Sequence, residues 1–481
     1  MKKLVIVALS IATALSLISC NEDFLDTSPT ETIPNAPNEY KLNGLYVMMV
    51  MDRTGGTTRH EDFGQKGNDI IMDLLSSDMA LAKNSYNRYL RLANLSATED
   101  FTDDFNYIPW RYYYRVIIGA NDILTNIDGN SDTDKHIIGQ TKALRAYAYF
   151  YLMQLYNKEY APNEKAIPIY TNPAQESQPK STQAQVYQLI IDDLTEAITL
   201  LDNFDRAHKG MIDKYVAKGL LAYAYAAMGN YAKVEELSMD IINNSGLNIT
   251  TRENLLGGFN NLATNPSWMW GFDITTENGL DLISWWGQVD LYTYSYASVG
   301  DFKTMDEGLY NSIRTDDIRK EQFNGTYKNF KYFATGKFYN TAAKAARKIG
   351  GQRIVTDDYV YMRVDEFHLL AAEALAKQGK EAQAKQILKN FLNNGNDKYI
   401  KVTDVSYIDG LTGTGLTDEI YLQTRIEFWG EGKSYLAMKR NKATITRARN
   451  HQFHGGASFA HNDGKLTLEI PQQEVNNNPN L

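Results

Sequence analysis

The stretch TKALRAYAYFYLMQLY, residues 141–156, decides the fold of this chain. Small alanines at positions 143, 146 and 148 alternate with the large side chains of Tyr147, Phe150, Tyr151 and Leu155. Alternation of small and large side chains lets a helix approach its neighbours closely. The stretch therefore predicts a helix that is packed among other helices in a mainly α protein.

Helical patterns continue on both sides of this stretch. We expect helices over 39–51 and 107–127, and a third after the capping box at residues 182–185, where an apolar stripe follows. Residues 222–242 and 369–392 each combine a helix, a turn at a glycine and a second helix, which resembles a tetratricopeptide unit. The two units are not in tandem, and two ordinary helical hairpins are the alternative. The pattern therefore favours a discontinuous tetratricopeptide-like helical bundle.

The middle of the chain has a different character. Residues 245–357 contain many Asn and Thr, a Gly pair and four tryptophans, at positions 268, 270, 285 and 286, with weak periodicity. We interpret them as an irregular, loop-rich insertion with short strands, in which Trp268 and Trp270 belong to a core strand. Residues 52–103 are also mixed and loop-rich. The division that follows is a signal peptide (1–19), a lipid-anchored tether (20–38), an N-terminal helical part of the scaffold (39–244), the aromatic-rich insertion (245–357) and a C-terminal helical part (358–481).

The beginning of the chain predicts its destination. Lys2 and Lys3 precede an apolar stretch that ends at Ile18, and Cys20 is the only cysteine. This pattern is typical of a secretory signal rather than a membrane span. A cysteine directly after it predicts lipid attachment at Cys20 and a mature chain that begins there. An ordinary secreted protein with an incidental cysteine is the alternative.

Composition excludes several classes of function. Removal of residues 1–19 takes away two lysines and no acids, so the formal charge changes from −9 to −11. An acidic chain without a basic run gives no electrostatic reason to bind nucleic acid. One cysteine cannot form an internal disulfide. No motif indicates a cofactor.

Motifs along nearly the whole chain resemble those of the SusD/RagB family of surface glycan-binding lipoproteins. Their shared order, together with the lipid signal, carries the resemblance. They are residues 24–26 after the cysteine, 144–150, 167–168, 215–231, 364–379, 425–433, 439–440, 470–474 and 478–479. Gln423, Ser434 and Ala437 depart from the family pattern, where Glu, Arg and Asp are usual, and we expect them to weaken a buried salt-bridge network.

The resemblance implies a role at the outer membrane. Such proteins act as lids on a TonB-dependent transporter of the SusC type, capture an oligosaccharide or in some branches a peptide, and hand it inward. They are not enzymes. The acids after Cys20 look like a signal for export to the outer surface. The chain is therefore expected to be lipid-anchored in the outer membrane, facing the cell exterior.

Sugar binding needs flat apolar faces and polar hydrogen-bonding groups, and one segment concentrates both. Its candidate ligand-binding residues are Trp285, Trp286, Gln288, Asp290, Tyr292, Tyr294 and Tyr296. Alternation of the three tyrosines predicts that their rings share one face of an extended segment. We also expect Trp285→Ala or Trp286→Ala to weaken glycan binding while the fold stays intact. The alternative is that these rings pack the insertion onto the bundle.

A second candidate region precedes the central helices, where the family often lines its site. It contains Asp78, Tyr86, Arg88 and Tyr89. This assignment carries over by region only.

Enzyme and metal interpretations find little support. His451, His454 and His461 lack the ordered spacing of a zinc site, and no catalytic residue or metal is predicted. Three classes of function remain. They are a glycan-binding lipoprotein, a helical-repeat transporter lid that binds peptide or protein, and a surface hydrolase whose carboxylates meet only in space.

Overall fold

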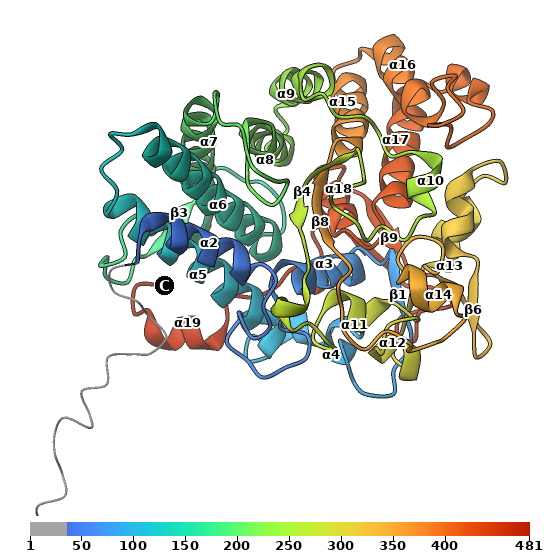
Figure 1. Ribbon diagram of the computed structural model, residues 1–481, viewed down its shortest axis with the longest axis horizontal. Helices are drawn as coiled ribbons and strands as arrows, with labels where there is room; N and C mark the ends of the chain where they lie inside the picture. Colours follow the sequence, from blue (N-terminus) through green and yellow to red (C-terminus); the bar gives the residue numbers. More distant parts are fainter. Residues whose placement is uncertain (1–35) are drawn as a thin grey trace, which may run out of the picture.

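The computed structural model describes residues 36–481 (Figure 1). The predicted signal peptide and Cys20 lie outside this range. Within it, helices dominate, and the predicted mainly α fold is confirmed. No helix among the described residues has the length and apolar character needed to cross a membrane.

A row of antiparallel helices forms the scaffold, and each packs against the next. The row runs from the left of Figure 1 across its top to the right. Its members are α5 (Asp104–Thr125), α6 (Asp132–Tyr156), α7 (Gln183–Leu200), α8 (Lys214–Ala227), α9 (Tyr231–Asn244), α15 (Asp365–Lys377), α16 (Glu381–Leu392) and α17 (Gly413–Glu427). The predicted capping box begins α7, because Thr182 and Gln185 bond each other's backbone N–H groups.

The two predicted helical hairpins are α8–α9 and α15–α16. Gly229 and Gly379 adopt φ of +76° and +75°, a conformation that favours glycine, and each lies in the short turn between its two helices. Although the units are far apart in sequence, α9 packs directly against α15. The scaffold is therefore continuous in space, and the insertion leaves and rejoins it at one place.

Among the described residues, five short sheets connect segments of the chain outside this row of helices. Each sheet has two antiparallel strands. The pairs are β1 (Met79–Lys83) with β5 (Phe302–Met305), β2 (Lys165–Pro168) with β3 (Lys180–Thr182), β4 (Trp268–Phe272) with β8 (Tyr359–Arg363), β6 (Gly325–Tyr327) with β7 (Phe330–Phe333), and β9 (Thr444–Thr446) with β10 (Ser458–Ala460). Pairing of β4 with β8 joins the two ends of the insertion, and Trp268 and Trp270 are buried there as predicted.

One buried helix was not predicted. Residues 52–103 read as loops, yet α3 (Gly64–Leu75) is buried along its entire length between α18 (Lys433–Arg440), α5 and β1. Its many polar side chains make the sequence look exposed, but some of them have partners on other buried segments. Gln65 Oε1 accepts from the Tyr113 hydroxyl on α5 at 2.9 Å, and Asp73 accepts from the N–H of Gly432 at 3.2 Å. Tertiary partners therefore allow a sequence that looks exposed to lie in the core.

The remaining helices are short or peripheral. They are α2 (Asn38–Met48), α4 (Leu90–Ala93), α10 (Arg252–Leu255), α11 (Trp285–Val289), α12 (Tyr296–Val299), α13 (Glu307–Ser312), α14 (Thr341–Ala345) and α19 (Gln472–Asn477).

A buried ionic network ties the insertion to the C-terminal helices. Its centre is Arg363, whose Nη1 lies 2.8 Å from Glu427 Oε1 and whose Nε lies 2.8 Å from Glu431 Oε2. The full set pairs four cations, Arg319, Lys337, Arg363 and Lys401, with four carboxylates, Asp317, Asp365, Glu427 and Glu431. Gln423, one of the departures from the family pattern, stays in the network as a neutral acceptor for Arg319. The charges of the network therefore balance with glutamine at this position.

Candidate functional site

Loops from distant parts of the chain bring four side chains together at the surface. Tyr86, Tyr296, His60 and Arg88 form what we call the tyrosine cluster. Tyr86 is 50% exposed, and its ring meets Tyr296 edge to face with centroids 5.8 Å apart. The guanidinium carbon of Arg88 lies 5.0 Å from the centroid of Tyr296. The cluster thus offers an exposed aromatic ring beside a cation, the combination that sugar rings and their hydroxyls need.

His60 completes the cluster from the other side. Its ring also meets Tyr296 edge to face, and its Nδ1 lies 2.6 Å from the Tyr296 hydroxyl oxygen. Burial, followed by the charge of Arg88, lowers the pKa of His60. The imidazole is therefore neutral at neutral pH, and it fixes the hydroxyl of Tyr296 without adding a second positive charge.

A buried carboxylate holds the loop that carries Tyr86 and Arg88. Asp301 accepts hydrogen bonds from the backbone N–H groups of Ser85 at 2.6 Å, Tyr86 at 2.7 Å and Arg88 at 3.1 Å. Antiparallel pairing of β1 with β5 places this loop beside Asp301, since the loop follows β1 and Asp301 precedes β5. Three hydrogen bonds to one carboxyl group fix the loop firmly.

Glu61 supports the same loop. One of its oxygens accepts from the N–H of Tyr89 at 3.1 Å, and the other from Arg88 Nη1 at 3.3 Å. The arginine is therefore oriented by a carboxylate while part of its side chain remains at the surface.

The two tryptophans expected to bind ligand lie in the core instead. Trp285 and Trp286 are each 1% exposed, and Trp285 packs edge to face on Phe338 with centroids 4.5 Å apart. Their assignment as an exposed platform is wrong in this structure. The alternative interpretation, in which the rings pack the insertion onto the scaffold, describes them correctly.

The three tyrosines of this segment do not share one face. Serine caps at Ser284 and Ser295 begin the short helices α11 and α12, so the segment is not extended. As a result Tyr292 is half-buried, Tyr294 is 40% exposed and Tyr296 is 7% exposed. Tyr294 is therefore the most exposed of the three rings, and Tyr296 is the most buried.

Gln288 and Asp290 are buried and position loops. Gln288 Nε2 donates to the carbonyl of His60 at 3.0 Å, and its oxygen accepts from Lys303 Nζ at 3.1 Å. Asp290 accepts from the N–H groups of Tyr292 and Thr293, each at 2.9 Å. Burial raises the pKa of Asp290 to about 7. Neither side chain is available to a ligand in this structure.

The second candidate region likewise contains both surface and buried residues. Tyr86 and Arg88 belong to the tyrosine cluster, whereas Asp78 and Tyr89 are fully buried. Asp78 accepts from Arg425 Nε at 2.9 Å, which joins β1 to α17. Tyr89 packs against Phe105 and lies 5.0 Å from Lys303 Nζ.

The sequence interpretation missed His60, Asp301 and Arg353. The guanidinium carbon of Arg353 lies 3.9 Å from the ring centroid of Tyr294, so these two exposed side chains form a cation–ring pair. These residues lie in stretches without periodicity, and their partners are far away in the chain. No local signal could have assigned them.

Other polar groups of the chain have structural roles. His451 and His454 have separate partners, the Asp306 carboxylate at 3.0 Å and the Asn94 carbonyl at 2.8 Å. His461 lies 3.5 Å from Glu159. Within residues 36–481 there is no group of three or more His, Cys, Asp or Glu that could hold a metal.

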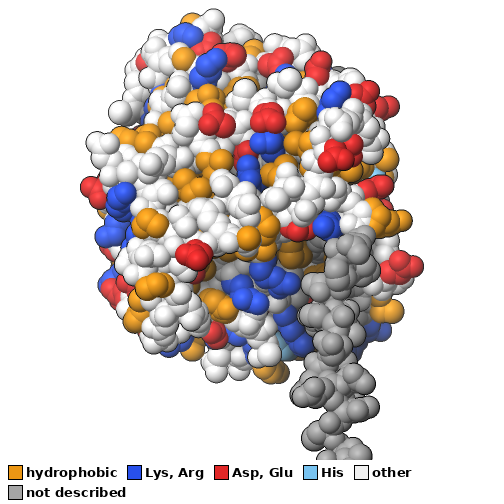
Figure 2. All heavy atoms as spheres, turned by 90° about the vertical axis from the view of Figure 1, so that its left-hand side faces the viewer, with side chains coloured by type: hydrophobic (Ala, Val, Ile, Leu, Met, Phe, Trp, Pro, Cys, Tyr) orange, Lys and Arg blue, Asp and Glu red, His pale blue; other side chains and the backbone are white. Residues whose placement is uncertain are grey.

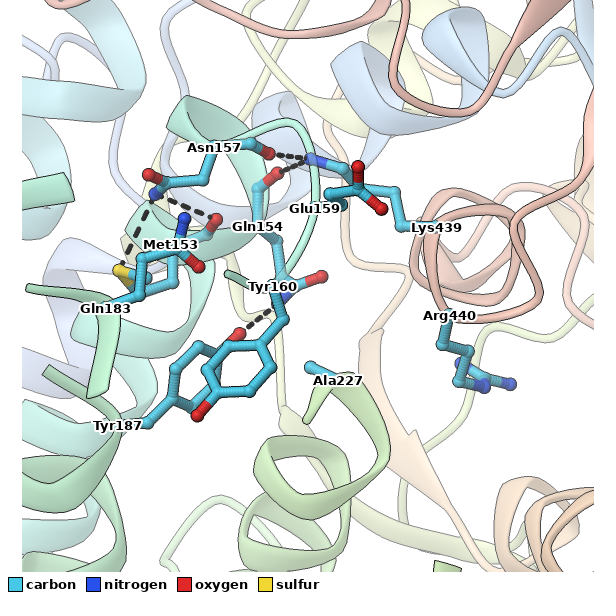
Figure 3. Close-up of a pocket in the computed structure, with 10 residues that line it drawn as sticks. All are labelled: Met153, Gln154, Asn157, Glu159, Tyr160, Gln183, Tyr187, Ala227, Lys439 and Arg440. Carbon is cyan, nitrogen blue, oxygen red and sulfur yellow. Dashed lines mark hydrogen bonds between the residues drawn. The ribbon is translucent and has the colours of Figure 1, made fainter. Parts of the chain in front are cut away.

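A small pocket beside α6 shows why lysine stands at position 439 (Figure 3). It has a volume of about 30 Å³, enough for a single water. Lys439 donates to the carbonyls of Gln154 and Asn157 at the C-terminal end of α6. Burial lowers the pKa of Lys439 to about 7. The lysine therefore caps a helix end and leaves no space for an oligosaccharide.

Comparison with known proteins agrees with this architecture. A family described as "Starch-binding associating with outer membrane" matches residues 23–227, and the "SusD family" matches residues 243–481. SusD-like protein P25 of Formosa agariphila is 24% identical over 246 residues, which cover 48% of this chain and 44% of that protein. The chain thus aligns with less than half the length of this relative.

Solved structures share the fold over most of both chains. A SusD-like carbohydrate binding protein from Bacteroides vulgatus has a TM-score of 0.77 and 24% identity, over 92% of this chain and 96% of that one. Surface glycan-binding protein A from Bacteroides thetaiotaomicron, solved in complex with laminarihexaose, has a TM-score of 0.69 and 14% identity, over 92% and 97%.

The two family matches define the class of this protein, since proteins of the SusD family are non-catalytic glycan-binding proteins. The chain belongs to the SusD/RagB family.

Proposed function

We propose that this chain is a surface lipoprotein that binds oligosaccharide at the tyrosine cluster and delivers it to a TonB-dependent transporter of the SusC type. The exposed ring of Tyr86, held beside Tyr296 and Arg88, is the observation that carries the binding assignment. An aromatic face packs on the C–H face of a sugar, and the arginine and tyrosine polar groups bond its hydroxyls. Family membership supports this choice of ligand, as does the complex of a structural neighbour with laminarihexaose.

The cluster is prepared before a ligand arrives. Asp301 and Glu61 hold the loop of Tyr86, and His60 orients the hydroxyl of Tyr296. Since these side chains are already ordered, little conformational entropy is lost on binding. Such a site suits a protein that must capture dilute ligand repeatedly.

The anchor and the transporter complete the proposal. Lipid at Cys20 would hold the chain at the outer membrane, and the family description names association with that membrane. The broad helical scaffold offers the surface for a transporter partner. Purification of the lipidated chain from outer membranes should recover a TonB-dependent transporter with it. Recovery of the chain alone under mild detergent would contradict the delivery role.

The binding assignment is tested by single ring removals. Soluble chain lacking the signal and Cys20 is titrated calorimetrically with a panel of neutral oligosaccharides and with peptides. Tyr86→Ala should weaken glycan binding about tenfold, as expected for about 1.4 kcal/mol of lost stacking. Tyr294→Ala removes the exposed ring two residues before Tyr296 and tests whether the site extends beyond the cluster. Tyr40→Ala is the matched control, because Tyr40 is 68% exposed on α2 and lies outside the cluster.

Two results would contradict this assignment. Equal affinity in Tyr86→Ala, Tyr294→Ala and Tyr40→Ala would move the site elsewhere. Saturable binding of peptides without binding of any oligosaccharide would favour the peptide- or protein-binding lid.

A further inference from the structure

An open cleft lies between α5 and α19, away from the tyrosine cluster. It has a volume of about 340 Å³, and six of its lining residues come from α5 and three from α19. Figure 2 looks onto this side of the molecule, where basic side chains gather around a hollow in the lower half of the face. We propose that this cleft is a second glycan site that selects anionic oligosaccharides, whose sugars carry carboxylate or sulfate groups. The inference rests on the proposed glycan-binding function and adds a separate site to it.

The walls of the cleft follow from the spacing of α5. Tyr107, Arg111, Tyr114, Arg115 and Ile118 recur every three or four residues, so they line one face of the helix. Tyr107 and Tyr114 are half-buried, whereas Ile118 is 48% exposed. The wall therefore combines two accessible rings, an apolar side chain and two guanidinium groups. Rings and an apolar side chain suit the flat face of a sugar.

The far wall is held in place by its own hydrogen bonds. Trp110 Nε1 donates to Glu474 Oε2 at 3.2 Å, and Asn478 Nδ2 donates to Glu474 Oε1 at 3.0 Å. Both oxygens of this carboxylate are thus already bonded. Next to it, the buried Oε1 of Gln473 has no hydrogen-bond partner within residues 36–481. A buried acceptor without a donor is satisfied by a ligand hydroxyl.

The two arginines give the cleft its charge selectivity. Neither Arg111 nor Arg115 has a carboxylate within 4 Å among the described residues. Arg115 uses only Nη1, which donates to the carbonyl of Thr54 at 3.0 Å. One helical turn apart, two forked donors match carboxylate or sulfate oxygens in a bidentate manner. A neutral sugar offers them no such partner.

A glycine turn fixes the position of Arg111. Gly56 has φ of +79°, and a Cβ built on it would lie 2.2 Å from Arg111 Nε. The side chain therefore crosses Gly56 directly. Gly56→Ala would displace the guanidinium while keeping its charge, which makes it a positional test of the site.

The test compares ligands that differ only in charge. Tetragalacturonate and its methyl ester probe carboxylates, and a sulfated galactan tetrasaccharide with its desulfated form probes sulfates. Isothermal titration of the soluble chain should show binding of at least one anionic form that weakens as NaCl is raised, with its neutral form at least about tenfold weaker. Arg111→Gln with Arg115→Gln should weaken the anionic ligand by a similar factor. Arg449→Gln is the control, because Arg449 is exposed and does not line the cleft.

These variants test the two proposed sites independently. Tyr86→Ala should leave anionic binding unchanged, and the paired arginine variant should leave binding of neutral glycans at the tyrosine cluster unchanged. The second site is refuted if no anionic ligand binds, if acid and ester bind equally, or if Tyr86→Ala alone removes the anionic binding. If every variant, including Tyr86→Ala, binds neutral glycans as tightly as the wild type, the proposed function of the tyrosine cluster is refuted instead.

Discussion

Glu427→Gln should destabilise this chain more than any exposed charge removal. Glu427 bridges Arg363 and Arg319 at 2.8 and 3.0 Å, and all three side chains are fully buried. Glutamine keeps the shape but leaves the network with four cations and three carboxylates. Removal of one partner from a buried ion pair typically costs about 3–5 kcal/mol, because the remaining charge is not compensated. This loss is a large share of the free energy of unfolding of a typical folded domain, which is about 5–15 kcal/mol.

Urea unfolding of the soluble chain, followed by circular dichroism at pH 7, measures this difference. Glu235→Gln is the matched control, since the Lys380–Glu235 pair is close, at 2.6 Å, but partly exposed. Exposed pairs contribute about 1 kcal/mol or less. A loss in Glu427→Gln no larger than the loss in Glu235→Gln would refute the view that the network is a buried, balanced unit.

The pH dependence of the stability difference between the wild type and Glu427→Gln provides a second check. Burial alone would raise the pKa of Glu427, but Arg363, Lys401 and Arg319 together lower it well below its usual value. The folded-state pKa is thus below that of the unfolded chain, so the stabilisation is present above about pH 4.5 and is lost as the pH falls through the folded-state pKa. The gap between wild type and Glu427→Gln should be constant from pH 7 to about 5 and narrow only below that.

Three further predictions follow from the packing. Trp285→Ala should lower the free energy of unfolding by about 3–5 kcal/mol, because the ring fills the core, and a variant with unchanged stability in urea would contradict its burial. Gly219→Ala should lower the free energy of unfolding by about 1–3 kcal/mol, because the added Cβ would lie 2.5 Å from Phe367 Cζ. Gly44→Ala on α2 is the control: no atom lies within 4 Å of its Cβ, so it should be neutral or stabilising in thermal melts. Equal effects of the two substitutions would argue against the close contact at Gly219. Burial raises the folded-state pKa of Asp290 to about 7 from its usual 3.8, so the stability of the chain should fall as the pH rises from about 4 to 7. Asp290→Asn should make stability, measured by urea titration, depend less on pH over this range. An unchanged pH dependence would assign the fall in stability to other groups.

The scaffold could be predicted because its signals are local. The capping box before α7 and the glycine turns after α8 and α15 each act within a few residues. Helical periodicity likewise repeats within one or two turns. The segment α3 escaped prediction for the opposite reason, since the buried Gln65 and Asp73 bond to Tyr113 and Gly432, partners that the local sequence does not reveal.

The candidate site could be predicted only in part. The region of Tyr86 and Arg88 was found through family resemblance, and Tyr294 and Tyr296 through their aromatic density. Composition could not separate these from Trp285, because exposed and buried rings have the same local sequence signal. Exposure depends on what packs against a ring, and Phe338 covers Trp285 from more than fifty residues away.

The sequence by itself determined a mainly helical chain with two hairpins and a resemblance that names its family, and it predicts lipid attachment at Cys20. Tertiary structure alone decided that α9 meets α15 and that His60 meets Tyr296 across 236 residues. It also decided that Asp301, with no local signal, fixes the loop of Tyr86. The physical reason is the distance along the chain over which each interaction acts. Helix propensity and capping act over a few residues, whereas burial, ion pairing and the shape of a cleft arise only when distant segments pack together.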